Sequence, residues 1–357
     1  MSTQTDIIFT KICAESLEQK ASEIYLFPAQ IPFIRVDAKV QPLPGGKVLS
    51  ETFIQESIDS LLTSEEQARL KREFQIVLVK EIGKQGPVKI NVFFQKGALA
   101  LSLKLLAGES IDLEKLGLPQ MVKDLTELSQ GIVFVTGPRD SGRSTLVAAL
   151  LDHINKTQAK FIATLEAPIR YKLRPLKSIV EQREVPQDVK SFQDGLAYIR
   201  QRNVDVVMVS RVDDQKVMKE IFAISQAATL VFVIMDTDSA AKTVQRVLHF
   251  FPAEEALTAR YFLSENLGAI VSSRLIPKIG RGRIRALEVL PGIPAVRTII
   301  QEGKFHQLSS ILQTGERTRS ISLDQYLADL VTSGEVLAEE AVKYATNEEL
   351  FRSLLRR

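Results

Sequence analysis

The sequence predicts an α/β protein of two domains, an α+β domain over residues 1–118 and a larger domain over residues 119–357. From Pro119 onward, helical and strand-like segments alternate, which is typical of a parallel sheet covered by helices on both faces. Residues 204–209 and 230–235 are continuous apolar runs, as expected of strands that are buried on both faces. A length of 357 residues gives both domains room for a substantial core.

The composition excludes several classes of protein. The 46 basic and 43 acidic residues give a net charge of +3, which by itself predicts neither a nucleic-acid partner nor a membrane surface. The single cysteine, Cys13, excludes a disulfide framework and fits a reducing cytoplasm, and the three histidines lack metal-ligand spacing. The first 20 residues carry charges and no long apolar core, so we expect a cytoplasmic protein without a signal peptide.

The first domain combines helices with short strands. Gln67 follows Ser64 by three residues, which predicts a capping box at the start of one helix. Glycine and proline turns separate the later strands, which we expect to form one small sheet. The predicted helices span residues 6–20, 50–62 and 64–74, a turn spans 42–46, and the predicted strands span 23–27, 33–37, 76–81, 89–95 and 98–106.

The second domain begins with a predicted helix and then alternates. The expected helices span residues 121–129, 144–155, 189–200 and 216–226, and the expected strands span 131–135, 161–165, 204–209 and 230–235. From residue 253 the pattern is mainly helical, apart from a hairpin-like piece at residues 280–290. The alternating arginines of that piece would share one strand face, which we expect to be solvated rather than a nucleic-acid surface.

The stretch from Gly131 to Thr145, GIVFVTGPRDSGRST, runs from an apolar strand through a glycine turn into a helix. This order is typical of a phosphate-binding loop, in which backbone N–H groups and a helix N-terminus surround a polyphosphate. The usual pattern is G-x-x-x-x-G-K-[ST], and here an arginine occupies the lysine position. Without its context, such a loop could also be a simple turn and helix cap.

Five further segments give that loop its context. They are VEQREV at 180, DTDSAAKTVQRVLHFFPAEE at 236, LIPKIGRGRIRALEVLPGIPAVRTIIQEGK at 275, SLDQYLADLVTSGEV at 322 and, leading into the loop, GIVFVTGP at 131. With these segments in this order, the chain resembles the PilT-type retraction ATPases of type IV pili, within the type II/IV secretion ATPase superfamily, over about residues 20–345.

The resemblance implies a PAS-like N-terminal domain, a RecA-like P-loop NTPase domain with a helical C-terminal part, and a hexameric ring with nucleotide between subunits. It implies ATP and Mg²⁺ as cofactors, with Ser144 reaching the metal and Glu166 activating water, if the site is functional; a damaged site would hold neither. The residues expected to contact nucleotide are Gly137, Pro138, Ser141, Gly142, Arg143, Ser144 and Thr145.

Several positions depart from the family pattern, and four of them lie where the resemblance places phosphate, metal or water. Arg143 keeps the lysine's charge on a larger, planar group, and Asp140 brings a carboxylate and a non-glycine backbone into the loop. Arg211 replaces the Walker B glutamate, where a cation opposes metal binding and cannot accept a proton. Asp236 replaces the histidine that senses the γ-phosphate. The reversed charges of the last two suggest an ion pair between them.

Together these departures predict a degenerate PilT-like protein that acts as a non-catalytic or regulatory subunit of the pilus motor. A slow but active ATPase that uses Arg143, Ser144 and Glu166 to power retraction is the alternative, and a scaffold unrelated to pili is a third reading. The resemblance implies a homo-hexamer or an assembly with an active PilT-like paralogue, a pilus platform protein of the inner membrane as partner, and a place at the inner face of that membrane. We expect no nucleic-acid partner.

Overall fold

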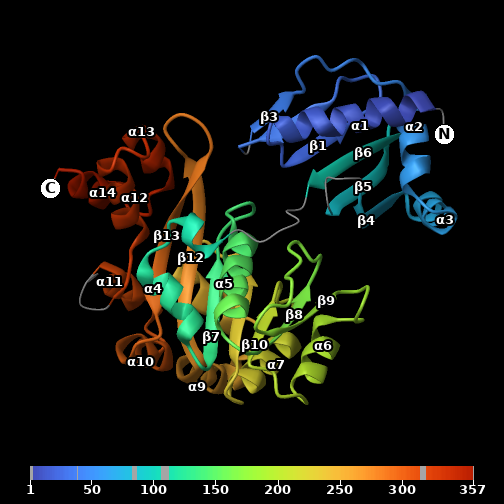
Figure 1. Cartoon of the computed structure of the whole chain (residues 1–357). Helices are drawn as coiled ribbons and strands as arrows, with labels where there is room; N and C mark the ends of the chain where they lie inside the picture. The colour runs from blue at the N-terminus through green and yellow to red at the C-terminus, as the bar shows by residue number, and fades with distance from the viewer. Residues whose placement is uncertain (1–2, 38, 83–86, 106–111, 314–318, 357) are drawn as a thin grey trace. The chain divides into compact units, whose positions relative to one another are not determined.

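The computed structural model, drawn in Figure 1, describes residues 3–37, 39–82, 87–105, 112–313 and 319–356. Contacts within the chain divide it into two compact units, residues 1–108 and residues 109–357. The short helix η2 (Leu113–Leu116) therefore belongs to the second unit. Each unit has its own hydrophobic core and is described by itself.

The first unit is a six-stranded antiparallel sheet with strand order β3-β2-β1-β6-β5-β4. One face of the sheet packs against α1 and α2 around buried residues such as Ile12, Ile54 and Leu101. Its elements are α1 (Thr3–Glu18), β1 (Glu23–Leu26), β2 (Phe33–Val36), β3 (Lys39–Pro42), α2 (Glu51–Leu61), α3 (Ser64–Glu73), β4 (Gln75–Glu81), β5 (Pro87–Gln95) and β6 (Ala98–Leu105).

The second unit is built on a seven-stranded sheet of order β13-β12-β7-β11-β10-β8-β9, parallel except for the antiparallel pairing of β12 with β13. Its first elements are α4 (Gln120–Lys123), η3 (Asp124–Glu127), β7 (Gly131–Thr136), α5 (Arg143–Thr157), β8 (Phe161–Glu166), β9 (Ile179–Glu184), α6 (Phe192–Ile199), β10 (Val206–Val209), α7 (Gln215–Ser225), β11 (Leu230–Met235) and α8 (Ala240–Leu248). The remaining elements are η4 (Ala253–Glu255), α9 (Ala256–Asn266), β12 (Leu267–Pro277), β13 (Arg283–Pro291), α10 (Pro294–Glu302), η5 (Phe305–Gln307), α11 (Leu308–Gln313), α12 (Leu323–Thr332), α13 (Ala338–Ala341), η7 (Val342–Tyr344) and α14 (Glu348–Leu354).

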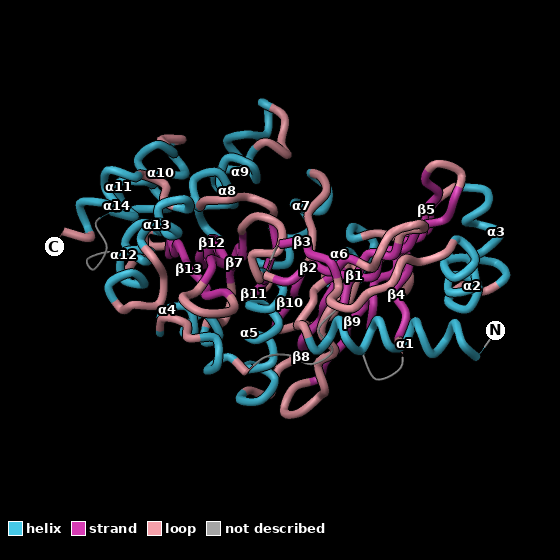
Figure 2. Tube along the Cα trace, turned by 90° about the horizontal axis from the view of Figure 1, so that it is seen from above, coloured by secondary structure: helices cyan, strands magenta, loops and turns pink. Residues whose placement is uncertain are grey.

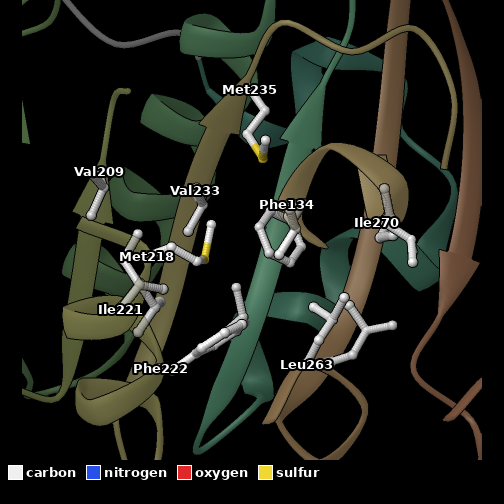
Figure 3. Packing of buried hydrophobic residues seen from close by; sticks show 14 of the residues in the cluster. Phe134, Val209, Met218, Ile221, Phe222, Val233, Met235, Leu263 and Ile270 are labelled. Atoms are coloured by element: carbon white, nitrogen blue, oxygen red, sulfur yellow. The ribbon is translucent and has the colours of Figure 1, made fainter. Parts of the chain in front are cut away.

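Strand β7 is buried on both faces, as its apolar sequence predicts. Ile132 and Phe134 pack into a core formed with α6 to α10, whereas Val133 and Val135 pack into a second core formed with α5. Figure 2 shows strands β7, β10 and β11 lying between α5 on one side and α7, α8 and α9 on the other. Figure 3 shows Phe134 among the side chains of α7 and α9. Burying each such side chain contributes about 2–3 kcal/mol to stability.

The structure corrects several sequence predictions. The predicted mainly helical region after residue 253 contains the eleven-residue strand β12, which pairs with β7 and extends the central sheet. The capping box of α3 is formed by Thr63 and Glu66, one residue earlier than predicted, because the Thr63 side chain accepts from the Glu66 N–H and the Glu66 carboxylate accepts from the Thr63 N–H. Strands β3 and β9 were not predicted, and the predicted helix at 121–129 is only the short α4 followed by η3. Residue 106, the end of one predicted strand, lies outside the described residues.

Candidate functional site

The glycine loop connects the carboxyl end of β7 to the start of α5. Gly137 has a φ of 144°, and a Cβ on it would lie 2.2 Å from the Ser273 carbonyl oxygen, so only glycine fits there. Asp140 has a φ of 60°, in the left-handed region that favours glycine. The loop thus contains one position that only glycine can occupy and one non-glycine residue in the left-handed region.

The N-terminus of α5 has no side-chain cap. Gly142 is its N-cap residue, with a φ of 80°, and no side chain accepts a hydrogen bond from the first turn. Helices α2, α6, α7 and α8 each have a serine or aspartate cap that accepts from their first turn, whereas α9 and α10, like α5, have none. The uncapped N–H groups at the start of a 15-residue helix fit an anionic ligand such as a phosphate.

Two hydroxyls at the loop also lack partners. Thr136 Oγ1 at the end of β7 and Ser141 Oγ in the loop are buried without any hydrogen bond. Buried hydroxyls are usually paired, so these two point to a polar ligand or water in the loop. The residues present therefore fit a bound phosphate group.

Arg143, which occupies the lysine position, is directed toward the neighbouring strand β11. Its Nη1 donates a hydrogen bond of 2.6 Å to the Met235 carbonyl oxygen and forms an ion pair with the Asp236 carboxylate. The pairing follows from topology, because β11 lies beside β7 and Met235 is in register with Thr136. The arginine of the loop is thus held by a carboxylate that follows the neighbouring strand.

The predicted ion pair between Arg211 and Asp236 is wrong. Arg211, which follows β10, is exposed and pairs with Asp213 two residues later, while Asp236 pairs with Arg143. The physical reason is proximity: Asp213 is available to Arg211 within its own turn, and Asp236 follows the strand next to the phosphate loop.

Glu166 lies at the carboxyl end of β8 and is 5% exposed. Its carboxylate accepts hydrogen bonds from Thr164 Oγ1 at 2.8 Å and from Gln182 Nε2 at 3.1 Å. Burial raises the pKa of Glu166 above its ordinary value, against the lowering effect of these hydrogen bonds. A carboxyl group with a raised pKa at a strand end is suited to proton transfer.

The expected metal ligands are few. Ser144 is partly exposed in the first turn of α5, and the neighbouring Thr145 Oγ1 lies 2.6 Å from the Tyr171 hydroxyl. Among the described residues, no group of three histidine, cysteine or acidic side chains is arranged to hold a metal ion. The residues at the loop therefore fit a phosphate group better than a metal ion.

Arg285 of β13 is a site residue that the sequence analysis placed on a solvated face. The structure contradicts that expectation: Arg285 is 8% exposed, and its Nη1 lies 3.4 Å from the Ser141 carbonyl oxygen and 3.2 Å from that of Gly142. The alternation did predict that Arg283 and Arg285, two residues apart on β13, lie on one face of a strand. What that face contacts depends on β12, the strand that the sequence pattern did not reveal.

Comparison with known proteins gives the family. The family described as "Type II/IV secretion system protein" matches residues 4–288. The type IV pilus retraction ATPase PilT of Pseudomonas aeruginosa is 32% identical over 96% of this chain and 99% of its own length. The chain belongs to the PilT family of type II/IV secretion ATPases. A twitching motility protein of Neisseria gonorrhoeae is 31% identical to this PilT-family chain over 89% of the chain and 85% of its own length.

The fold of this PilT-family chain agrees with a solved relative. The crystal structure of the pilus retraction motor PilT with bound ADP superimposes with a TM-score of 0.85 at 32% identity, covering 96% of this chain and 98% of that one. The predicted fold class, an α/β protein with an α+β N-terminal domain and a helical C-terminal part, is confirmed. In the part of the chain that the structure describes, no helix is long and apolar enough to cross a bilayer.

Proposed function

We propose that this chain is a type IV pilus motor subunit that binds nucleotide at the Gly137–Thr145 loop and hydrolyses it slowly or not at all. The observation that carries the proposal is the Arg143–Asp236 ion pair, which holds the loop's own cation on the neighbouring strand. The uncapped helix α5 and the unpaired Ser141 hydroxyl support binding of a phosphate group.

The expected defect lies in turnover rather than in the shape of the loop. Arg211 cannot accept a proton and repels a divalent cation, and Asp236 places negative charge beside the strand end where a γ-phosphate would lie. Bound nucleotide would then act as a regulatory ligand that changes how the subunit contacts its neighbours. Its partners would be copies of itself in a hexamer or an active PilT-like paralogue, together with the platform protein of the pilus machine.

A mixing experiment tests this proposal. The purified chain is added in increasing ratio to an intact PilT ATPase, and assembly is followed by native mass spectrometry while phosphate release is measured. We expect mixed rings whose hydrolysis rate changes with the ratio of the two chains. Separate assemblies, with an unchanged rate at every ratio, would refute the regulatory role.

A slow ATPase is the second candidate, and Glu166 is the observation that favours it. This carboxyl group is buried, hydrogen-bonded and has a raised pKa, as a general base requires. If the purified chain releases phosphate from Mg-ATP, and E166Q abolishes that release without loss of binding, the chain is a slow ATPase and not only a regulatory subunit.

A further inference from the structure

We propose that Arg285 is a positioning residue that holds the phosphate loop from its carbonyl side and provides the positive charge that Arg143 directs elsewhere. The proposal rests on the proposed function, because it assigns Arg285 a role in binding the phosphates of a nucleotide. No loop motif predicts it, since Arg285 lies 143 residues after Gly142, on strand β13.

The contacts of Arg285 define its place. Its Nη1 lies within hydrogen-bonding distance of the carbonyl oxygens of Ser141 and Gly142, and it donates to Ser273 Oγ at 2.5 Å. A Cβ on Gly142 would lie 2.7 Å from Arg285 Nη2, so the guanidinium lies directly against the loop backbone. Because it contacts carbonyl groups there, it leaves the N–H groups at the start of α5 free for an anion.

The charge of Arg285 has no carboxylate partner among the described residues. No ion pair involves it, and its Nε is buried without a hydrogen bond. Burial lowers the pKa of Arg285 to about 10, so the group still carries its charge at neutral pH. A buried cation without a counter-charge is unfavourable, and a phosphate bound on the other side of the loop would supply the missing negative charge.

The loop carbonyls do not depend on Arg285. Ser141 O also accepts a hydrogen bond from Ser273 Oγ at 2.8 Å, and Gly142 O accepts one from the Leu146 N–H at 3.0 Å. Removing the guanidinium would therefore leave neither carbonyl without a donor. A residue required only for folding would behave differently, because its loss would leave polar groups unpaired.

The experiment compares the unaltered chain with R285M, R285K and the control R281M. Arg281 is an exposed arginine before the same strand, so its replacement makes the same chemical change away from the loop. Mg-ADP binding is measured by calorimetry, and thermal unfolding is measured without ligand. We expect R285M to weaken Mg-ADP binding on the order of tenfold without lowering the ligand-free Tm, R285K to bind more tightly than R285M, and R281M to match the unaltered chain.

Each other outcome contradicts the inference in a recognisable way. If the unaltered chain and R285M bind Mg-ADP equally, Arg285 has no role in the site, while the proposed function stands. If R285M lowers the ligand-free Tm by several degrees and R285K restores Tm and binding in parallel, Arg285 is structural only. If the unaltered chain does not bind Mg-ADP at all, the proposed function fails together with the inference.

Discussion

Replacing Asp236 by asparagine tests whether the Arg143–Asp236 ion pair restrains nucleotide binding. The substitution removes the carboxylate that pairs with Arg143 and keeps a side chain of the same size. Arg143 would retain its 2.6 Å hydrogen bond to the Met235 carbonyl oxygen. A nucleotide phosphate can displace that hydrogen bond alone more easily than the hydrogen bond together with the ion pair to Asp236. We therefore expect D236N to bind Mg-ADP more tightly than the unaltered chain.

The magnitude follows from the exposure of the two side chains. The Arg143 side chain is 13% exposed, whereas the Asp236 side chain is 75% exposed, so solvent screens the pair and its strength is at most about 1 kcal/mol. Releasing that energy during binding corresponds to an affinity gain of about threefold to fivefold. Losing the pair in the ligand-free protein should lower Tm by no more than about 2–4 °C for a unit of this size.

Calorimetric titration with Mg-ADP at low and high salt measures the effect. The advantage of D236N should shrink at high salt, because screening already weakens the pair in the unaltered chain. D213N is the matched control, since it removes one exposed carboxylate from the same edge of the sheet, where Asp213 pairs with Arg211 and not with Arg143. Equal or weaker binding by D236N, or an equal gain in D213N, would refute the reasoning.

Three further substitutions test other parts of the site. Burial raises the folded-state pKa of Glu166 above its unfolded value, so ionisation of Glu166 lowers stability as pH rises from the unfolded pKa through the folded one. E166Q should therefore unfold at a higher temperature than the unaltered chain near pH 7. A difference in Tm that does not shrink toward pH 4 would contradict this cause. R211E should raise the Mg²⁺ dependence of nucleotide binding while changing the free energy of unfolding by only about 0.5 kcal/mol. If R211E and the unaltered chain bind nucleotide equally with and without Mg²⁺, Arg211 does not exclude the metal. G137A should abolish Mg-ADP binding, because its Cβ would lie 2.2 Å from the Ser273 carbonyl oxygen. The control G334A has a φ of 73° and open space around its Cβ, so it should cost only about 1–2 kcal/mol of stability and leave binding intact.

Local pattern was enough to predict the strand–loop–helix unit and the apolar strands of the second unit. Glycine spacing predicted the loop, and continuous apolar runs predicted β10 and β11 because both faces of these strands are buried. The strand β12 was missed because its sequence, LGAIVSSRLIP, has neither a continuous apolar run nor regular alternation. One of its two serines contacts the loop, because Ser273 Oγ donates to the Ser141 carbonyl oxygen.

The contacts of charged side chains could not be predicted from spacing. The sequence singled out Arg143, Arg211 and Asp236, but which of them form ion pairs depends on strand order, which places β11 rather than β10 beside β7. Arg285 requires the same information, since only the pairing of β13 with β12, and of β12 with β7, brings it to the loop. Spacing in the sequence identifies the candidate charged residues, and the sheet topology determines which of them lie close together.

Titration of the purified chain with Mg-ATP, with phosphate release followed in the same samples, tests the central claim most directly. A nucleotide-binding motor subunit that has lost fast hydrolysis should give saturable binding to the loop with phosphate release at least a thousandfold slower than about 1 per second, the lower range of ordinary enzymes. Tight binding accompanied by turnover of about 1 per second or faster would contradict the account, as would the absence of any binding.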